Sequence, residues 1–97
     1  MKEIERIKNE IRRNLPFLRD KYKVKEIGIF GSYVKGEQRK RSDVDILIDF
    51  YETIDLFTFV ELEDFISKIL GIKVDLVMKD TLKPRIKERI LKEAITI

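Results

Sequence analysis

A helical spacing of apolar residues marks three segments of this chain. The first segment is an amphipathic helix in which Pro16 predicts a break or kink. Its apolar stripe consists of Ile4, Ile7, Ile11, Leu15 and Leu18. The second helix is expected over residues 54–70, capped by Thr53 and ended by Gly71. The third helix is expected to have Thr81 as its cap and Pro84 in its first turn.

Short apolar runs between these helices predict strands at residues 24–30, 43–50 and 73–78. The first two are expected to pair antiparallel, because the loop between them returns as a long hairpin. The apolar tail at residues 95–97 either adds a strand or docks on the core. The pattern therefore predicts an α+β fold of two layers, a small mixed sheet with helices packed on one face. The whole chain, residues 1–97, is expected to form a single domain.

The strand at 43–50 carries two carboxylates on one face, because residues two apart in a strand point the same way. Asp43 and Asp45 therefore project together, and the apolar residues of the strand project into the core. These apolar residues are Val44, Ile46, Ile48 and Phe50. Two adjacent carboxylates repel each other, so a cation between them is expected, and Mg²⁺ prefers such oxygen ligands. The alternative for these two residues alone is a solvated start of a strand.

Two further features support a site. Gly31 and Ser32 precede Asp43 by a ten-residue loop, and a Gly-Ser turn offers backbone amides and a hydroxyl to phosphate groups. Asp75 is a lone carboxylate in the apolar third strand, where an unpaired charge is costly. Three acids from two strands can hold two Mg²⁺ ions, the arrangement used for in-line attack on phosphorus.

The loop before Asp43 is basic, and two interpretations of it remain open. It is either a hairpin tip kept soluble by its charge, or a region that contacts phosphate. Under the second interpretation Arg39 and Arg41 are the candidate nucleotide-binding residues, since a guanidinium grips phosphate with two hydrogen bonds. The basic residues of the last helix fit a solvated face better than a binding site.

Composition excludes several classes of protein. The chain has no cysteine and no histidine, which excludes disulfides, zinc–thiolate sites and catalytic triads based on histidine. Its net charge of +3 is too small to predict direct binding of a nucleic acid. No apolar run is long enough for a membrane span, and the amphipathic, partly acidic N-terminus is not a signal peptide. We expect a cytoplasmic protein that does not bind a membrane.

The second helix has more apolar surface than a helix buried on one side needs. It is either sunk between the sheet and the first helix, or it offers an apolar surface to a protein partner. Phe57 favours the second interpretation, because it falls on the polar side of the helix, near Glu61 and Asp64. The pattern alone leaves the oligomeric state open.

The spacing of Gly31-Ser32, Asp43-x-Asp45 and Asp75 resembles the signature of the minimal nucleotidyltransferases, in the polymerase-beta-like nucleotidyltransferase superfamily. The resemblance covers nearly the whole chain. It implies the palm fold of that superfamily, two Mg²⁺ ions held by Asp43, Asp45 and Asp75 as catalytic residues, and ATP as substrate. It also implies an antitoxin that transfers AMP to a tyrosine of a partner toxin, a ribonuclease with a HEPN domain.

Two alternatives to that function remain. One is nucleotidyl transfer to another acceptor, such as an antibiotic or an RNA end. The other is an antitoxin that binds its toxin without catalysis, although loss of a motif acid would have favoured that function and none is lost. In a domain of 97 residues the palm leaves no room for a second domain, so the acceptor is expected to dock from outside.

Overall fold

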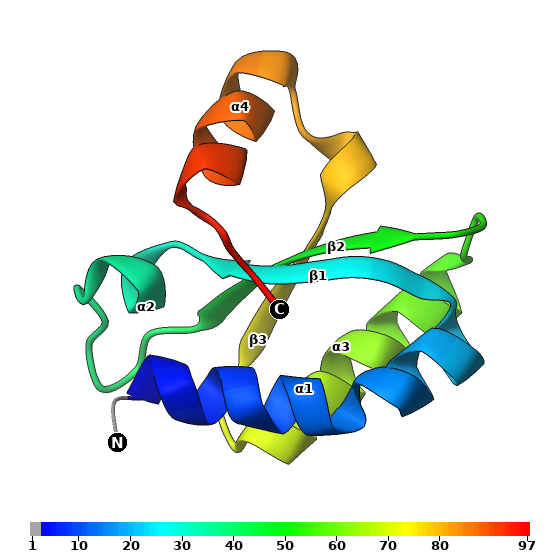
Figure 1. Ribbon diagram of the computed structural model, residues 1–97, viewed down its shortest axis with the longest axis horizontal. Helices are drawn as coiled ribbons and strands as arrows, with labels where there is room; N and C mark the ends of the chain where they lie inside the picture. Colours follow the sequence, from blue (N-terminus) through cyan, green and yellow to red (C-terminus); the bar gives the residue numbers. More distant parts are fainter. Residues whose placement is uncertain (1–2) are drawn as a thin grey trace.

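The computed structural model describes residues 3–97 (Figure 1). Met1 and Lys2, part of the predicted 1–97 domain, lie outside the described residues. The helices are α1 (Glu3–Tyr22), α2 (Ser32–Lys35), α3 (Leu56–Leu70) and α4 (Pro84–Glu93), with a short 3-10 turn, η1 (Lys79–Thr81). The strands are β1 (Val24–Phe30), β2 (Val44–Phe50), β3 (Val74–Met78) and β4 (Ile95–Thr96). No helix of the described part is long and apolar enough to cross a membrane.

The strands form one mixed sheet in the order β3-β2-β1-β4. β1 pairs antiparallel with both β2 and β4, and β2 pairs parallel with β3. The predicted antiparallel hairpin is therefore confirmed, as is the α+β class with a small mixed sheet. The apolar tail meets both of its alternatives, since Ile95 and Thr96 add a strand and Ile97 packs against the core. β3 is an edge strand, which matters for the site because it carries Asp75.

α1 and α3 lie side by side on one face of the sheet and enclose the core (Figure 1). From β2 the core receives Val44, Ile46 and Ile48, each at most 1% exposed, as the alternation predicts. In α3 the fully buried apolar residues, Leu62, Ile66 and Leu70, run from the middle of the helix to its end, and Phe59 is partly buried. In the first half Leu56 is 72% exposed and Phe57 87% exposed. The interpretation of α3 as a deeply sunken helix is therefore wrong for its first half.

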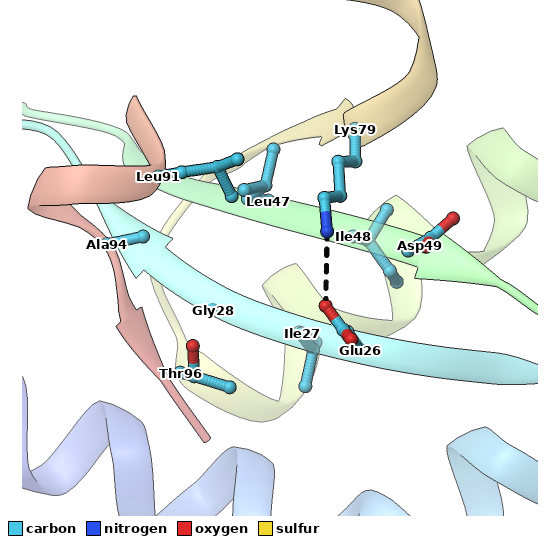
Figure 2. Close-up of a pocket in the computed structure, with 10 residues that line it drawn as sticks. All are labelled: Glu26, Ile27, Gly28, Leu47, Ile48, Asp49, Lys79, Leu91, Ala94 and Thr96. Carbon is cyan, nitrogen blue, oxygen red and sulfur yellow. Dashed lines mark hydrogen bonds and ion pairs between the residues drawn. The ribbon is translucent and has the colours of Figure 1, made fainter. Parts of the chain in front are cut away.

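The last helix departs from the expectation that all helices share one face. Figure 1 shows α4 on the opposite side of the sheet from α1 and α3, which already cover their face. Figure 2 shows Leu91 and Ala94 beside Gly28 and Leu47, around a small cavity of about 40 Å³. This cavity is too small for a nucleotide.

Two predicted helix caps are wrong. Asp55, not Thr53, caps α3, because its carboxylate accepts a hydrogen bond of 2.8 Å from the amide of Thr58. Thr81 lies in η1, where its hydroxyl donates to the carbonyl of Met78, and α4 begins at Pro84 without a side-chain cap. α1 also continues through Pro16 as one helix instead of breaking there. Gly71 ends α3 in the left-handed conformation, as predicted.

Candidate active site

The three predicted carboxylates lie at the amino-terminal ends of two neighbouring strands. Asp45 and Asp75 are direct partners in the parallel pairing of β2 with β3. Asp43 comes just before β2 begins and was predicted as its first residue. Val44 and Val74 face the core, so Asp45 and Asp75 point to the opposite face of the sheet. The fold therefore places at neighbouring strand ends three acids that are up to 32 positions apart in the sequence.

The pKa of Asp45 is raised above its ordinary value. Partial burial raises its pKa, and the negative charges of Asp75 and Asp43 raise it further. Asp45 is half-buried and Asp75 is exposed. The carboxylates thus destabilise one another in the absence of a cation, which is the condition that favours binding of one.

Gly31 occupies a position at which any other residue would be strained. It has a φ of 77°, in the region that L side chains rarely adopt. A Cβ at this position would overlap Oδ2 of Asp45 and lie 3.0 Å from its Cγ. The glycine therefore gives Asp45 its space, which links the two halves of the predicted motif directly.

Ser32 begins the short helix α2, which the sequence pattern did not predict. The amides of Val34 and Lys35 both donate to the carbonyl of Gly31, and the turn ends at Gly36 with a φ of 71°. The hydroxyl of Ser32 makes no hydrogen bond within residues 3–97, so it is available to a ligand. Lys35 is occupied by an ion pair with Glu93 of α4, 3.2 Å between Nζ and Oε1.

The basic loop has a defined backbone. The amide of Arg39 donates to Oγ of Ser42 at 2.7 Å, and the amide of Ser42 donates back to the carbonyl of Arg39 at 3.0 Å. The buried Tyr33 donates its hydroxyl to the carbonyl of Ser42, which ties this turn to α2. The side chains of Arg39 and Arg41 are exposed, and neither forms an ion pair within the described residues. Both guanidinium groups are therefore free for phosphate.

This loop forms one wall of a cleft of about 610 Å³ that reaches Asp43. Four basic residues line it: Arg39, Lys40, Arg41 and Lys73. Only Glu3 and Asp43 among its lining residues are acidic. Lys73 was missed in the sequence, where its position two residues before Asp75 is the only signal. A basic cleft next to a carboxylate cluster suits a nucleotide triphosphate.

The donor set fits Mg²⁺. Carboxylate oxygens are the ligands this ion prefers, and it commonly takes one or two of them together with phosphate oxygens. Within residues 3–97 the side chains, as they stand, do not gather three acidic groups around one point. Asp45 and Asp75 nevertheless lie on paired positions of adjacent strands, which run about 5 Å apart. A shared ion is therefore within reach of the carboxylates of Asp45 and Asp75 after side-chain rotation.

Comparison with known families identifies the class. A model of the nucleotidyltransferase domain matches residues 6–97. The chain belongs to this nucleotidyltransferase family, and the predicted enzyme class is confirmed. A relative, the protein adenylyltransferase MntA of Thermococcus cleftensis, is 50% identical over 80 residues, which cover 82% of this chain and 81% of that protein.

Solved structures place the fold in the same group. A structure described as a candidate minimal nucleotidyltransferase matches with a TM-score of 0.81 and 30% identity, covering 100% of this chain and 97% of that one. A toxin–antitoxin structure with AMP-PNP matches with a TM-score of 0.70 and 28% identity, covering 99% of this chain and 72% of the other. The predicted resemblance to the minimal nucleotidyltransferases is thus confirmed.

Proposed function

We propose that this chain is a protein adenylyltransferase that acts as an antitoxin. It transfers AMP from ATP to a tyrosine hydroxyl of a HEPN-domain ribonuclease toxin, in a reaction that depends on Mg²⁺ and takes place in the cytoplasm. The observation that carries the proposal is the pairing of Asp45 with Asp75 beside Asp43 and a basic cleft. The name of the Thermococcus relative supports the reaction, and the toxin–antitoxin structure with AMP-PNP supports the partner and the nucleotide.

Asp43, Asp45 and Asp75 are the residues that would hold the magnesium ions, which supply Lewis-acid stabilisation of charge on the phosphate oxygens. Ser32 would bind the β- or γ-phosphate through its free hydroxyl, and Arg39 and Arg41 would neutralise the triphosphate from the cleft wall. These contacts hold the nucleotide so that its α-phosphorus faces the incoming hydroxyl.

The transfer forms a bond between the tyrosine oxygen and the α-phosphorus of ATP. The bond between this phosphorus and the pyrophosphate oxygen breaks, and its electron pair leaves with pyrophosphate. The proton of the tyrosine hydroxyl passes to a carboxylate, which we assign to Asp75. Asp75 is exposed, whereas Asp43 and Asp45 are half-buried, so a tyrosine from a partner reaches Asp75 most directly.

A partner protein also has a surface to bind. Four large apolar side chains are exposed on or next to the first half of α3: Tyr51, Leu56, Phe57 and Val60, between 52% and 87% exposed. Tyr51 and Leu56 line two adjoining hollows of about 300 and 390 Å³ that share Ile54 and Met78. Phe57 and Val60 lie on α3 outside the lining of these hollows. We call these side chains and hollows the apolar groove. Exposed apolar surface gathered in this way is typical of a protein interface.

The charges around the apolar groove define the partner further. The charged residues that line the two hollows are all acidic: Asp49, Glu52, Asp55 and Asp80. None of the four forms an ion pair with a lysine or arginine within residues 3–97. The toxin segment that binds here is therefore expected to combine apolar side chains with lysine or arginine.

Intact-mass spectrometry tests the proposal. The chain is incubated with ATP, Mg²⁺ and a HEPN-domain toxin from the same organism, and the toxin is then weighed. A gain of one or more AMP units, located on tyrosine by fragmentation and absent with EDTA, is expected. An unchanged toxin mass in a tight complex would favour sequestration without catalysis. A nucleotide found on an RNA end or an antibiotic, with none on the toxin, would replace the proposed acceptor.

A further inference from the structure

The backbone around Asp75 is held by two side chains of α3. β3 is an edge strand, so one side of its backbone has no neighbouring strand. On that side the amide of Val74 donates to Oγ of Ser67 at 3.0 Å. The amide of Leu76 donates to Oε2 of Glu63 at 2.9 Å. The two residues that flank Asp75 are therefore both tied to the same helix.

The other side of the backbone at Asp75 faces β2. Amides alternate in direction along a strand, so the amide of Asp75 points away from α3 and toward β2. There Asp75 is the register partner of Asp45, and the carbonyl of Lys73 accepts a hydrogen bond of 2.9 Å from Val44. Asp75 is thus held between a strand and a helix by bonds to the residues around it.

Asp75 needs such support for two reasons. Its side chain is exposed and makes no hydrogen bond within the described residues, so nothing fixes it directly. Its negative charge also lies opposite that of its register partner Asp45, and like charges directly opposite each other in a sheet are destabilising. Edge strands are also the parts of a sheet most free to open locally.

We propose that Glu63 and Ser67 are positioning residues for the carboxylate of Asp75. They hold β3 against β2 through the amides of Leu76 and Val74, and so keep Asp75 opposite Asp45 for cation binding and proton transfer. This inference rests on the proposed function, because it concerns the same site. It adds two residues of α3 whose contacts are with the backbone of β3.

Ser67 also connects the two contacts. Its hydroxyl accepts a hydrogen bond from the amide of Val74 and donates one to the carbonyl of Glu63 at 2.9 Å. The hydroxyl is therefore engaged both as a donor and as an acceptor. Glu63 offers a carboxylate acceptor, and a hydrogen bond to a charged acceptor is stronger than one to a neutral acceptor. A glutamine at position 63 keeps an acceptor oxygen without the charge, whereas an alanine removes the acceptor.

The test measures cation binding and amide exchange in the free protein, without toxin or nucleotide. Mn²⁺ is titrated by paramagnetic resonance, and hydrogen exchange at Leu76 and Val74 is followed by NMR. Glu63→Ala is expected to weaken Mn²⁺ binding about tenfold and to accelerate exchange at Leu76. Glu63→Gln is expected to stay within about twofold of the wild type. Ser67→Ala is expected to weaken Mn²⁺ binding about threefold and to accelerate exchange at Val74.

Asp64→Ala is the matched control, because Asp64 is the next residue on α3 and its carboxylate pairs with Lys68, 2.9 Å away, instead of with β3. It should leave Mn²⁺ binding and both amides unchanged. Adenylylation kinetics add a separate readout, in which Glu63→Ala lowers kcat more than it changes KM for ATP, since the cleft is built from other residues. Near wild-type Mn²⁺ binding and kcat in Glu63→Gln would show that the acceptor oxygen matters. A general loss of packing in Glu63→Ala would then not explain its effect.

Two results would overturn the proposal. One is a Glu63→Ala protein that is less stable but binds Mn²⁺ like the wild type, which would make the contact merely structural. The other result concerns Ser67→Ala and applies if Glu63→Ala does not fold. The positioning role would be refuted if Ser67→Ala exchanged faster at Val74 and still bound Mn²⁺ with wild-type affinity. A different result would refute only the proposed function. In that case the wild type binds Mn²⁺ but adenylylates none of the toxins tested.

Discussion

One end of strand β2 carries the carboxylates and a basic cleft, and the other end opens on an acidic, apolar groove. At the first end four basic side chains line the cleft beside Asp43. At the second end the hollows next to Phe50 are lined by four acids and, among the described residues, by no lysine or arginine. A net charge of +3 conceals this division.

The difference separates two kinds of recognition. A nucleotide triphosphate is attracted to the basic end and repelled by the acidic end. An apolar segment with basic residues is recognised at the acidic end and has no reason to enter the cleft. Five residue steps from Asp45 to Phe50 correspond to about 17 Å. If the proposed toxin binds in the apolar groove, its target tyrosine has to reach the carboxylates across this distance, which corresponds to about five extended residues.

Asp45→Asn should impair catalysis at the carboxylate end of β2 without affecting the apolar groove, and this is the largest effect we expect. Turnover is expected to fall by at least about a hundredfold, or about 2.7 kcal/mol, because the central carboxylate of the cluster is lost. Toxin affinity should not change. The control is Asp49→Asn, which removes a carboxylate from the same strand and the same face at the acidic end. Steady-state kinetics at saturating toxin distinguish the two variants, and full activity in Asp45→Asn would contradict the assigned site.

Phe57→Asp should weaken binding of the toxin at the apolar groove without affecting the carboxylate end. Phe57 is 87% exposed, so the substitution does not disturb the core. A hot-spot loss of about 2 kcal/mol, roughly thirtyfold in toxin affinity, is expected, whereas ATP affinity stays the same. Calorimetric titration measures both affinities.

Ile86→Asp is the matched control for this substitution, because Ile86 is an exposed apolar residue on α4, 40% exposed. It should leave toxin affinity unchanged. Self-association competes for the same surface, and light scattering detects it. A homo-oligomer that Phe57→Asp dissociates, with wild-type toxin affinity, would assign the apolar groove to a second copy of the chain.

The end with the carboxylates could be predicted well from the sequence, because its signals are local. Alternation in β2 gave the direction of Asp45, and the glycine at position 31 indicated a special backbone. Helix α2 and the role of Lys73 could not be predicted. α2 has only four residues, and Lys73 joins the cleft through the pairing of β2 with β3.

The other end could be predicted only in part. The apolar surplus of α3 was visible in the sequence, but which half of the helix stays exposed depends on where the sheet and α1 end. Thr53 and Asp55 are both good caps, and only the hydrogen bond to Thr58 distinguishes them. The side taken by α4 depends on α1 and α3 having already covered the other face, which no local pattern contains.

Ser32→Ala should sharpen the comparison with a smaller effect at the first end. Loss of a hydrogen bond to a charged phosphate costs about 1.5 kcal/mol, or roughly tenfold in kcat/KM for ATP. The fold should not change, because the hydroxyl has no partner within the described residues. Ser67→Ala makes a poor control here, because the hydroxyl of Ser67 makes two hydrogen bonds. Thr96→Ser is the better control, because it alters a hydroxyl-bearing residue far from the cleft. Unchanged nucleotide kinetics in Ser32→Ala would remove Ser32 from the phosphate site.

Gly31→Ala tests how closely the turn depends on Asp45. The added methyl group would overlap Oδ2 of Asp45 and would sit at a φ of 77°. The overlap with Oδ2 and Cγ disappears in an Asp45→Ala background, whereas the close contact with Cβ of residue 45 and a backbone strain of about 1–3 kcal/mol remain. The destabilisation by Gly31→Ala should therefore be smaller in that background, and chemical denaturation of the four proteins measures the difference. Equal destabilisation in both backgrounds would show that the glycine serves the turn alone.

The smallest effect is a change of stability with pH, again confined to the carboxylate end. The pKa of Asp45 is raised above its ordinary value of 3.8 by burial and by Asp75 and Asp43. A raised pKa means that the folded chain holds this proton more tightly than the unfolded chain does. The cost of the charged form is therefore absent below pH 3.8 and grows as the pH rises through the raised value.

In metal-free buffer Asp45→Asn should melt a few degrees above the wild type near neutral pH, and this advantage should vanish in acid. Added Mg²⁺ should raise the melting temperature of the wild type and not that of Asp45→Asn, since bound cation relieves the repulsion only where the carboxylate is present. Differential scanning calorimetry across pH, with and without Mg²⁺, checks both signs, and a variant that is less stable than the wild type in metal-free buffer at neutral pH would mean that the carboxylates do not repel one another as their placement requires.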